Sequence, residues 1–171
     1  STPIVWTGLV SSDWNTAANW NPQQVPTSTD TAVINSGNVT FASNSVFFAL
    51  SFNGGFISGP VVVATNCFMY WNGGRLNPGS SLTVQSNAVA YLASSTQKDL
   101  GGRMTNSGRV VLGGSAFYIL NDNSSWQGSV TNLGTWEIQG DYTLGNYFGN
   151  VYTAFGNSGT LRKTTGSGVG V

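Results

Sequence analysis

The stretch Asn132-Leu-Gly-Thr-Trp136 is one of six copies of a short motif, Asn-x-Gly-x-apolar, that recurs along this chain. The other five copies begin at Asn35, Asn53, Asn72, Asn106 and Asn157. Successive copies start 18, 19, 34, 26 and 25 residues apart, and a degenerate copy without the glycine, Asn87-Ala-Val-Ala-Tyr91, divides the longest interval into 15 and 19. A fixed motif that returns at a period of about twenty residues is typical of a solenoid, in which similar coils stack into a rod.

The residue types in the motif suit a turn followed by a strand. Asparagine tolerates left-handed backbone and hydrogen-bonds within its own turn, and glycine adopts a positive φ without the penalty that a Cβ would cause. The apolar residue two positions after the glycine then begins a strand and points inward. We therefore expect one copy of the motif, and one such turn, in each coil.

Between the motifs, the pattern indicates three short strands per coil. Apolar residues alternate after the motif, as in Trp136-Glu-Ile138, with the period of a half-buried strand. A second strand follows a glycine, as in Gly114-Ser-Ala-Phe117-Tyr-Ile119, and a third precedes several motifs, as in Asn66-Cys-Phe-Met-Tyr-Trp71. This pattern predicts an all-β fold, a parallel β-helix of about seven short coils. A β-sandwich is the alternative, but it does not account for the repeated motif.

Residues 1–34 differ from the repeats and contain three tryptophans. Because a solenoid exposes its apolar interior at each end, a terminal segment has to cover it. We expect the three indole rings to form this cap, with Asp13 and Asp30 binding the backbone of the loops; a sugar-stacking site is the alternative reading of the same rings. The segment Thr16-Ala-Ala-Asn-Trp20 suits one helical turn. The three tryptophans are Trp6, Trp14 and Trp20.

The whole chain, residues 1–171, is expected to form one domain. It divides into the cap at 1–34, the β-helix repeats at 35–162, and a small, glycine-rich stretch at 163–171 that resembles a linker or a continuation of the solenoid. We therefore expect a covalently linked catalytic or solenoid domain as a neighbour.

Composition and charge exclude several classes of function. Only 7% of the residues are charged, and six basic and six acidic side chains cancel, so we expect neither nucleic acid nor a membrane as a partner. The sequence contains no apolar run near 18 residues, which argues against a transmembrane helix. It also starts without a basic and apolar leader, so we expect that any signal peptide has already been removed.

Several reactive residue types are rare or missing. Histidine is absent, which removes the commonest general base and metal ligand. The single cysteine, Cys67, has apolar neighbours and is expected to be a buried thiol. Glu137 and Asp141 are the only close pair of acidic residues, and an acid/base pair in a glycosidase needs two carboxylates about 5–10 Å apart. We expect them to be solvated groups at a strand edge and the protein not to be an enzyme.

The segment Asn121-Asp-Asn-Ser-Ser125 has oxygen ligands at alternate positions, like a calcium loop. It lacks the glycine and the distal glutamate that make such a loop specific. We expect a turn stabilised by asparagine side chains and no cofactor, with a structural calcium ion as the alternative.

The N-terminal segment resembles the opening of extracellular bacterial β-helix domains. The residues that carry the resemblance are Trp6-x-Gly8, Asp13-Trp14, Ala17-Ala-Asn-Trp20, Val25-Pro26 and Asp30-x-Ala-x-Ile34. The segment Asn157-Ser-Gly-Thr-Leu-Arg-Lys163 is similar to the repeats of the same domains. The resemblance implies a right-handed parallel β-helix from a secreted or cell-surface protein. Some domains of this kind are carbohydrate-binding modules attached to bacterial xylanases.

Exposed aromatic residues on a neutral solenoid are suited to polysaccharide binding. Sugar rings pack their C–H faces on aromatic planes, and the outward rows of a solenoid space such planes along one face. Trp126 lies in a polar loop, where no core position is evident, whereas Trp136 takes a core position in its motif. The residues expected to face outward and bind ligand are Trp71, Tyr91, Tyr118, Trp126 and Tyr147.

Two functions share these features. The first is a non-catalytic, monomeric carbohydrate-binding module of a secreted bacterial polysaccharide-degrading enzyme, which binds a plant polysaccharide such as xylan. The second is a structural stalk or adhesin-like segment of a surface protein. The fold alone cannot distinguish them. A module predicts that at least two of the five rings share one face, and a stalk predicts that they are scattered or buried.

Overall fold

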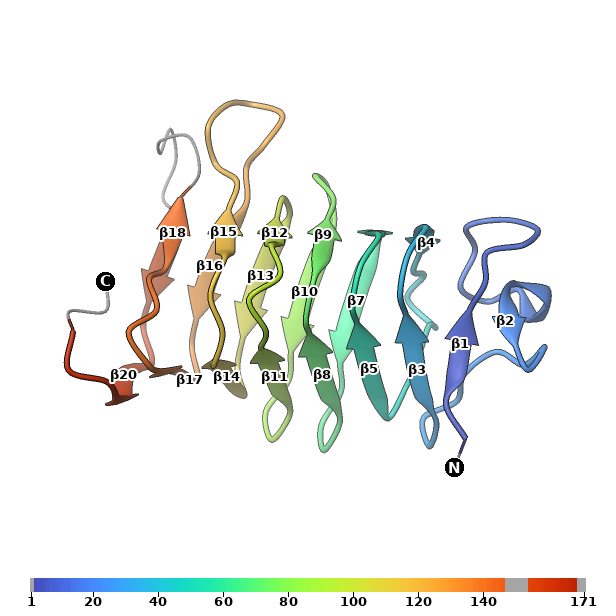
Figure 1. The fold of residues 1–171 in the computed structure, drawn as a ribbon, viewed down its shortest axis with the longest axis horizontal. Coiled ribbons are helices and arrows are strands. Elements are labelled where there is room, and N and C mark those ends of the chain that lie inside the picture. Colours follow the sequence, from blue (N-terminus) through green and yellow to red (C-terminus); the bar gives the residue numbers. More distant parts are fainter. Residues whose placement is uncertain (1, 147–153, 169–171) are drawn as a thin grey trace.

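The computed structural model describes residues 2–146 and 154–168, and these form a parallel β-helix of about six turns. The coils stack into a rod, with β1 and β2 at one end and β20 at the other (Figure 1). Each complete coil passes through three sheets in the same order, A, B and C, and then climbs to the next coil. The count of about seven coils expected from the sequence is therefore close.

The strands of the three sheets come from successive coils. Sheet A has the order β2 (Trp20–Asn21), β1 (Ile4–Trp6), β3 (Thr31–Ile34), β5 (Ala49–Phe52), β8 (Phe68–Trp71), β11 (Val89–Leu92), β14 (Arg109–Leu112), β17 (Thr135–Gln139) and β20 (Thr160–Thr165). Sheet B has the order β18 (Gly145–Asn146), β15 (Phe117–Ile119), β12 (Lys98–Leu100), β9 (Gly74–Leu76), β6 (Phe56–Ser58) and β4 (Asn38–Thr40). Sheet C has the order β19 (Phe155–Asn157), β16 (Ser129–Asn132), β13 (Arg103–Asn106), β10 (Ser81–Val84) and β7 (Pro60–Val63).

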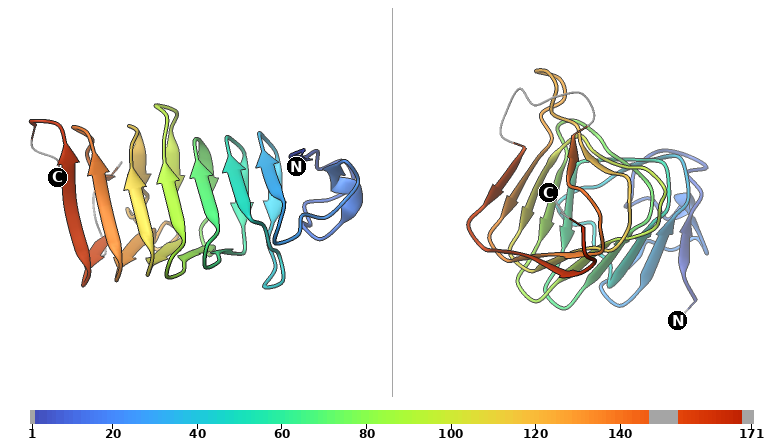
Figure 2. Two further views of the ribbon diagram at one scale, coloured as in Figure 1. Left: turned by 90° about the horizontal axis from the view of Figure 1, so that it is seen from below. Right: turned by 60° about the vertical axis from the view of Figure 1, so that its left-hand side comes forward.

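Neighbouring coils pair through parallel strands in register, as β14 does with β11 and β17. Within the described residues, the one antiparallel pair of strands is β1 with β2, in the N-terminal segment. The stacked parallel strands exclude the β-sandwich alternative, whose sheets would be antiparallel. Figure 2 shows the stack from two further sides.

The repeated motif occupies two different corners of the rod, which corrects the expectation of one equivalent turn per coil. The first three copies follow strands of sheet A, and the last three begin at the final residue of a strand of sheet C. The longest interval, 34 residues, separates Asn72 from Asn106 because the motif moves from one corner to the other between these two copies. The copies at the corner between sheets A and B are Asn35, Asn53 and Asn72, and those between sheets C and A are Asn106, Asn132 and Asn157.

At both corners the asparagines hydrogen-bond from coil to coil. Asn53 Nδ2 donates to Asn35 Oδ1 at 2.8 Å, and Asn72 donates to Asn53 at 2.9 Å. Along the other corner, Asn106 donates to Asn132 and Asn132 to Asn157, each at 2.7 Å. None of these six residues has the left-handed backbone that the sequence analysis expected of asparagine here.

The glycine of the motif permits the coils to approach each other. A Cβ placed on Gly134 would lie 2.2 Å from the carbonyl oxygen of Gly108 in the preceding coil, closer than any side chain tolerates. In the motif, the asparagine side chains thus form a ladder of hydrogen bonds from coil to coil, and the glycine lets the backbones of neighbouring coils approach closely.

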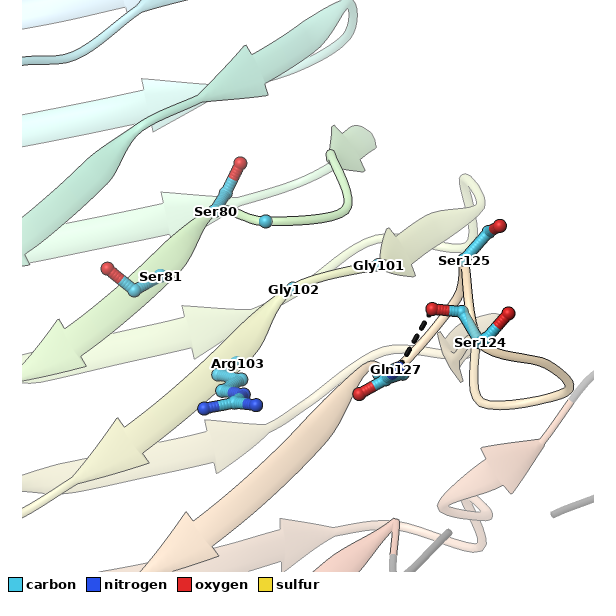
Figure 3. Close-up of a pocket in the computed structure, with 9 residues that line it drawn as sticks. Ser80, Ser81, Gly101, Gly102, Arg103, Ser124, Ser125 and Gln127 are labelled. Atoms are coloured by element: carbon cyan, nitrogen blue, oxygen red, sulfur yellow. Dashed lines mark hydrogen bonds between the residues drawn. The ribbon is translucent and has the colours of Figure 1, made fainter. Parts of the chain in front are cut away.

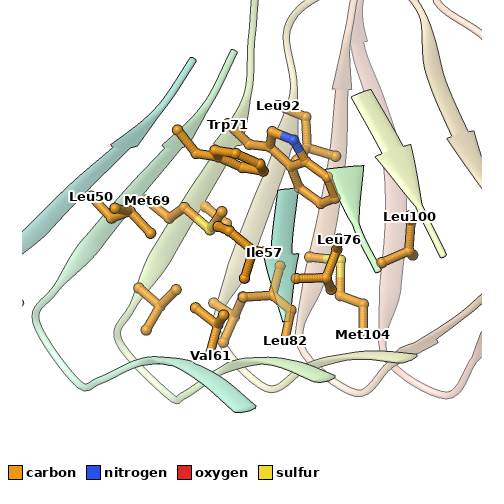
Figure 4. Packing of buried hydrophobic residues seen from close by; sticks show 14 of the residues in the cluster. Leu50, Ile57, Val61, Met69, Trp71, Leu76, Leu82, Leu92, Leu100 and Met104 are labelled. Atoms are coloured by element: carbon orange, nitrogen blue, oxygen red, sulfur yellow. The ribbon is translucent and has the colours of Figure 1, made fainter. Parts of the chain in front are cut away.

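Alternate residues of all three sheets fill the interior. In Figure 4, Met69 and Trp71 from sheet A meet Ile57 from sheet B and Leu82 from sheet C. The apolar residue of the motif points inward as expected in five copies, from Val39 in β4 to Trp136 in β17, whereas Leu161 in the last strand is 45% exposed.

Trp71 is fully buried, so its expected place on the surface is wrong. Within β8, Met69 and Trp71 face inward and Phe68 and Tyr70 face outward. Because side chains alternate along a strand, an error of one residue in parity exchanges the two faces. Cys67, just before this strand, is a buried thiol as predicted, and burial raises its pKa.

The three tryptophans cap the interior, as predicted. Trp14 and Trp20 are 0% and 1% exposed and meet edge to face with ring centroids 4.6 Å apart. Trp20 Nε1 donates to the carbonyl oxygen of Trp14 at 2.8 Å, and Trp6 packs edge-on against Trp20. The predicted helical turn is the short 3-10 helix η1 (Ala17–Asn19). These buried rings are not available as a sugar platform.

The two acidic residues of the cap segment bind their loops as expected. Asp13 accepts hydrogen bonds from Asn15 N and Thr16 Oγ1. Asp30 accepts from the backbone N–H and the hydroxyl of Thr27, and these bonds lower the pKa of its carboxyl group.

Candidate functional site

The outward face of sheet A carries a cluster of aromatic side chains in the middle of the rod. Tyr70 of β8 and Tyr91 of β11 are register partners, and their rings stack with centroids 5.2 Å apart and planes within 7° of parallel. Phe68 lies two residues before Tyr70, on the same face, and its ring meets that of Phe48 edge to face at 5.6 Å. We call these four residues the aromatic face.

Two members of the aromatic face are strongly exposed. Phe48 is 41% and Tyr70 39% exposed, although both are large rings. The register partners of Phe68 and Tyr70 in the preceding strand β5 are Ala49 and Ser51. Ser51 is too small to cover the adjacent side of the Tyr70 ring, whereas Phe48, just before β5, packs against Phe68.

Of the five residues expected to bind ligand, only Tyr91 belongs to this face. Phe68 and Tyr70 were missed because the parity of β8 was misjudged, and Phe48, which lies just before β5, was not singled out. The signal was present: Phe68-Met-Tyr70-Trp71 must place either Phe68 and Tyr70 or Met69 and Trp71 outside, and a methionine belongs in the core.

Next to the aromatic face, sheet A carries a buried ion cluster around Glu137. The register row runs from Tyr91 through Val111 to Glu137. Glu137 Oε2 accepts from Arg109 at 3.0 Å and from Arg162 at 2.9 Å, and Oε1 accepts from Gln139 at 2.7 Å. The carboxylate is only 4% exposed, so the expectation of a solvated group at a strand edge is wrong for Glu137.

This environment makes Glu137 unsuitable as a general acid. The hydrogen bond from Gln139, followed by those from Arg162 and Arg109, lowers the pKa of Glu137 to about 2. Asp141 is exposed and pairs with Lys163, and this hydrogen bond lowers the pKa of the Asp141 carboxyl group. A catalytic pair needs one carboxyl group that keeps its proton near neutral pH, and neither of these does.

The low pKa of Glu137 predicts a specific acid sensitivity. Since the unfolded chain titrates this group at 4.5 and the folded chain at about 2, the unfolded state binds more protons between these values. The stability that Glu137 contributes is therefore present above pH 4.5 and is lost as the pH falls toward 2. Denaturant unfolding as a function of pH should show a shallower decline over this window for Glu137→Gln than for the parent. Equal slopes would contradict this assignment.

On the outward face of sheet B, a second cluster surrounds Arg75. Its guanidinium lies 5.0 Å from the ring centroid of Trp126 and 5.7 Å from that of Phe56. It also pairs with Asp99 at 3.2 Å, and Tyr118 is the register partner of Asp99 on the next strand. Trp126 and Tyr118 are therefore gathered on one side of the rod, apart from Tyr91 on sheet A.

Trp126 acts as the anchor of its loop. This loop joins β15 to β16 and projects from the rod in Figure 1. The Trp126 ring is half-buried, and a Cβ placed on Gly101 would lie 3.0 Å from it, so the ring lies directly on that part of the backbone. With Arg75 over the ring as well, Trp126 is a weaker candidate for an open sugar platform than the aromatic face.

The same loop contains the segment considered for calcium. Asn123 Oδ1 accepts from the backbone N–H groups of Ser125 at 2.8 Å and Trp126 at 3.2 Å. Asn121 Nδ2 donates to the carbonyl oxygen of Gly128 at 2.7 Å. The predicted asparagine-stabilised turn is thus confirmed. Residues 2–146 and 154–168 contain no group of three or more acidic, histidine or cysteine side chains that could hold a metal ion.

Lys98 has no distinguishing feature in the sequence, yet its side chain is fully buried. Its Nζ donates to the carbonyl oxygens of Ser94, Thr96 and Ser115 at 3.1, 2.7 and 2.9 Å. Burial lowers its pKa to about 8. Because these three partners are backbone carbonyls of neighbouring turns, the ammonium group joins two coils.

The five expected ligand-binding residues are therefore dispersed. Tyr91 belongs to the aromatic face, Tyr118 and Trp126 lie on the side of sheet B, and Trp71 is in the core. Tyr147 lies outside the described residues.

Comparisons with known proteins yield no relative. No protein-family model matches the chain, and no curated protein or solved structure matches it either. Among the residues that the structure describes, no helix has the length and apolarity needed to cross a membrane.

Proposed function

We propose that this protein is a non-catalytic polysaccharide-binding module and that the aromatic face of sheet A is its platform. The observation that carries the proposal is the open pair Tyr70 and Tyr91, flanked by Phe68 and Phe48 on a rigid sheet. Large rings exposed together on a flat, regular surface are typical of ligand sites rather than of inert surface. A chain with zero formal net charge suits a ligand that is bound through C–H contacts and hydrogen bonds.

The finer parts of the proposal rest on the resemblance to extracellular bacterial β-helix domains. They are secretion, attachment to a neighbouring catalytic or solenoid domain, a monomeric state, and a plant polysaccharide such as xylan as ligand. Neither cofactor nor catalysis is part of the proposed function.

A structural stalk is the second candidate. It is favoured by the burial of Trp71. Tyr118 and Trp126 share one side of the rod, as a module predicts, but the Trp126 ring packs between Arg75 and Gly101 and is not an open platform. The open aromatic face favours the module over the stalk, because a stalk gains nothing from leaving Phe48 and Tyr70 exposed.

Affinity gel electrophoresis against xylan, mixed-linkage glucan, xyloglucan, mannan, alginate and pectin tests the proposal. We expect retardation by at least one of them, and a loss of about tenfold in affinity for Tyr70→Ala and for Tyr91→Ala, since one ring contact contributes about 1 kcal/mol or more. Tyr118→Ala is the matched control on another face and should bind like the parent.

Two results would overturn the proposal. One is the absence of retardation together with no binding to insoluble cellulose or chitin, which would favour the stalk. The other is binding of a neutral polysaccharide that survives both tyrosine substitutions on sheet A, which would place the site elsewhere.

A further inference from the structure

A cavity of about 460 Å³ lies beside the Trp126 loop (Figure 3). One wall is the beginning of β10, with Ser80 and Ser81, and the opposite wall is the loop with Ser124, Ser125 and Gln127. The glycines that precede β13 lie between the two walls, and Arg103 of β13 completes the lining (Figure 3). Its volume is within the range of about 300–1,000 Å³ in which proteins bind small ligands.

Arg103 is the unusual member of this cavity. The other three arginines of the chain are engaged in ion pairs, Arg75 with Asp99 and both Arg109 and Arg162 with Glu137. Arg103 is exposed, and its guanidinium makes no ion pair or hydrogen bond with the described residues. It therefore offers a fork of N–H donors, which suits a carboxylate, to whatever enters the cavity.

The other lining groups are short hydrogen-bonding side chains without negative charge. Ser81 is the register partner of Arg103 on the adjacent strand, and both residues line the cavity. Ser124, Ser125 and Gln127 present two hydroxyls and an amide from the loop. A ligand that matches this lining carries one carboxylate and several hydroxyl groups.

The walls are held in place before any ligand enters. Trp126 is fixed between Arg75 and Gly101, and Gln127 Nε2 donates to the carbonyl oxygen of Ser124 at 2.8 Å. A Cβ on Gly102 would lie 2.3 Å from the carbonyl oxygen of Ser80, so glycine is required where the coils pass each other. A preformed site loses less conformational entropy on binding.

We propose that this cavity binds a uronic acid unit of an acidic polysaccharide. Arg103 pairs with the sugar carboxylate, and the serine and glutamine side chains hydrogen-bond to the ring hydroxyls. The inference rests on the proposed polysaccharide-binding function and adds to it a second site, separate from the aromatic face, for an acidic sugar unit. Trp126 then serves as a positioning residue that holds the wall of the cavity.

The test is a titration of ¹⁵N-labelled protein with trimers of galacturonate, glucuronate and mannuronate, each also in its neutral methyl-ester form. We expect amide shift changes at Gly101, Gly102 and Ser125 with at least one acidic trimer, and at least tenfold weaker binding of its ester. Arg103→Gln should weaken binding of the acid to the level of the ester, and Arg103→Lys should restore part of it. Since Arg103 is exposed, its variants should melt at the parent's temperature.

The outcomes separate this inference from the proposed function. If no acidic trimer binds, if acid and ester bind equally, or if the shift changes lie elsewhere, the uronate site is wrong. Retardation by a neutral polysaccharide that depends on Tyr70 would still support the module. The converse result is uronate binding that depends on Arg103 and is unchanged in Tyr70→Ala. That result would support the cavity as the uronate site and would show that the aromatic face takes no part in uronate binding.

Discussion

Replacing Trp14 by alanine is expected to lower the free energy of unfolding by about 3–5 kcal/mol, the cost of deleting a large buried ring. Trp14 is 0% exposed and packs on Trp20, Phe41 and Phe47 with centroid distances of 4.6, 4.3 and 6.1 Å. Its removal leaves a cavity between the cap and the first coil. Urea unfolding followed by near- and far-ultraviolet circular dichroism measures the change.

Trp14→Phe is the matched control. The indole Nε1 of Trp14 is buried without a hydrogen-bond partner. The substitution by phenylalanine therefore reduces the packed volume but removes no hydrogen bond. We expect a cost of about half that of alanine or less. A loss below about 1 kcal/mol for Trp14→Ala would show that the cap contributes little to the cooperative core.

The second large effect is expected for Asn132→Ala, at about 2–4 kcal/mol, because several hydrogen-bonding groups lose their partner at once inside the protein. Asn132 is fully buried. Its Nδ2 donates to Asn157 Oδ1 at 2.7 Å and to the carbonyl oxygen of Thr160 at 3.0 Å, and its Oδ1 accepts from Asn106 at 2.7 Å. Thermal and urea unfolding measure the loss.

Asn53→Ala tests the same chemistry at the other corner. Asn53 also accepts one and donates one ladder hydrogen bond, but it is exposed, so water can replace its partners. We expect a cost of about 1 kcal/mol or less. Equal losses for the two asparagines would mean that the ladder bonds themselves, and not their burial, determine stability.

The sequence allowed the general plan of the molecule to be predicted for local reasons. Apolar alternation in β17 and the turn-forming Asn-x-Gly motif are properties of neighbouring residues. The cap was also predictable, because three tryptophans and two loop-binding aspartates lie within one short segment. These features indicated a parallel β-helix before any contact between distant residues was known.

The candidate site was predicted poorly, because it depends on contacts between coils. Trp71 and Tyr70 are adjacent, and in the sequence only the neighbouring methionine indicates which of them lies outside. Glu137 looks like an isolated surface acid in the sequence, yet Arg109 and Arg162 from the coils on either side enclose it. The role of Trp126 likewise depends on Arg75, fifty-one residues earlier in the chain.

By itself, then, the sequence determined the strand period, the glycines at which coils approach, and the aromatic cap. The tertiary structure alone decided that the asparagine motif forms ladders at two corners, that Tyr70 and Tyr91 stack between coils, and that Arg103 lines a cavity without a partner. The physical reason is that strand alternation and turn chemistry act between residues close in sequence. Register between coils, by contrast, joins residues about twenty positions apart, and which side chains meet depends on the length of every intervening turn.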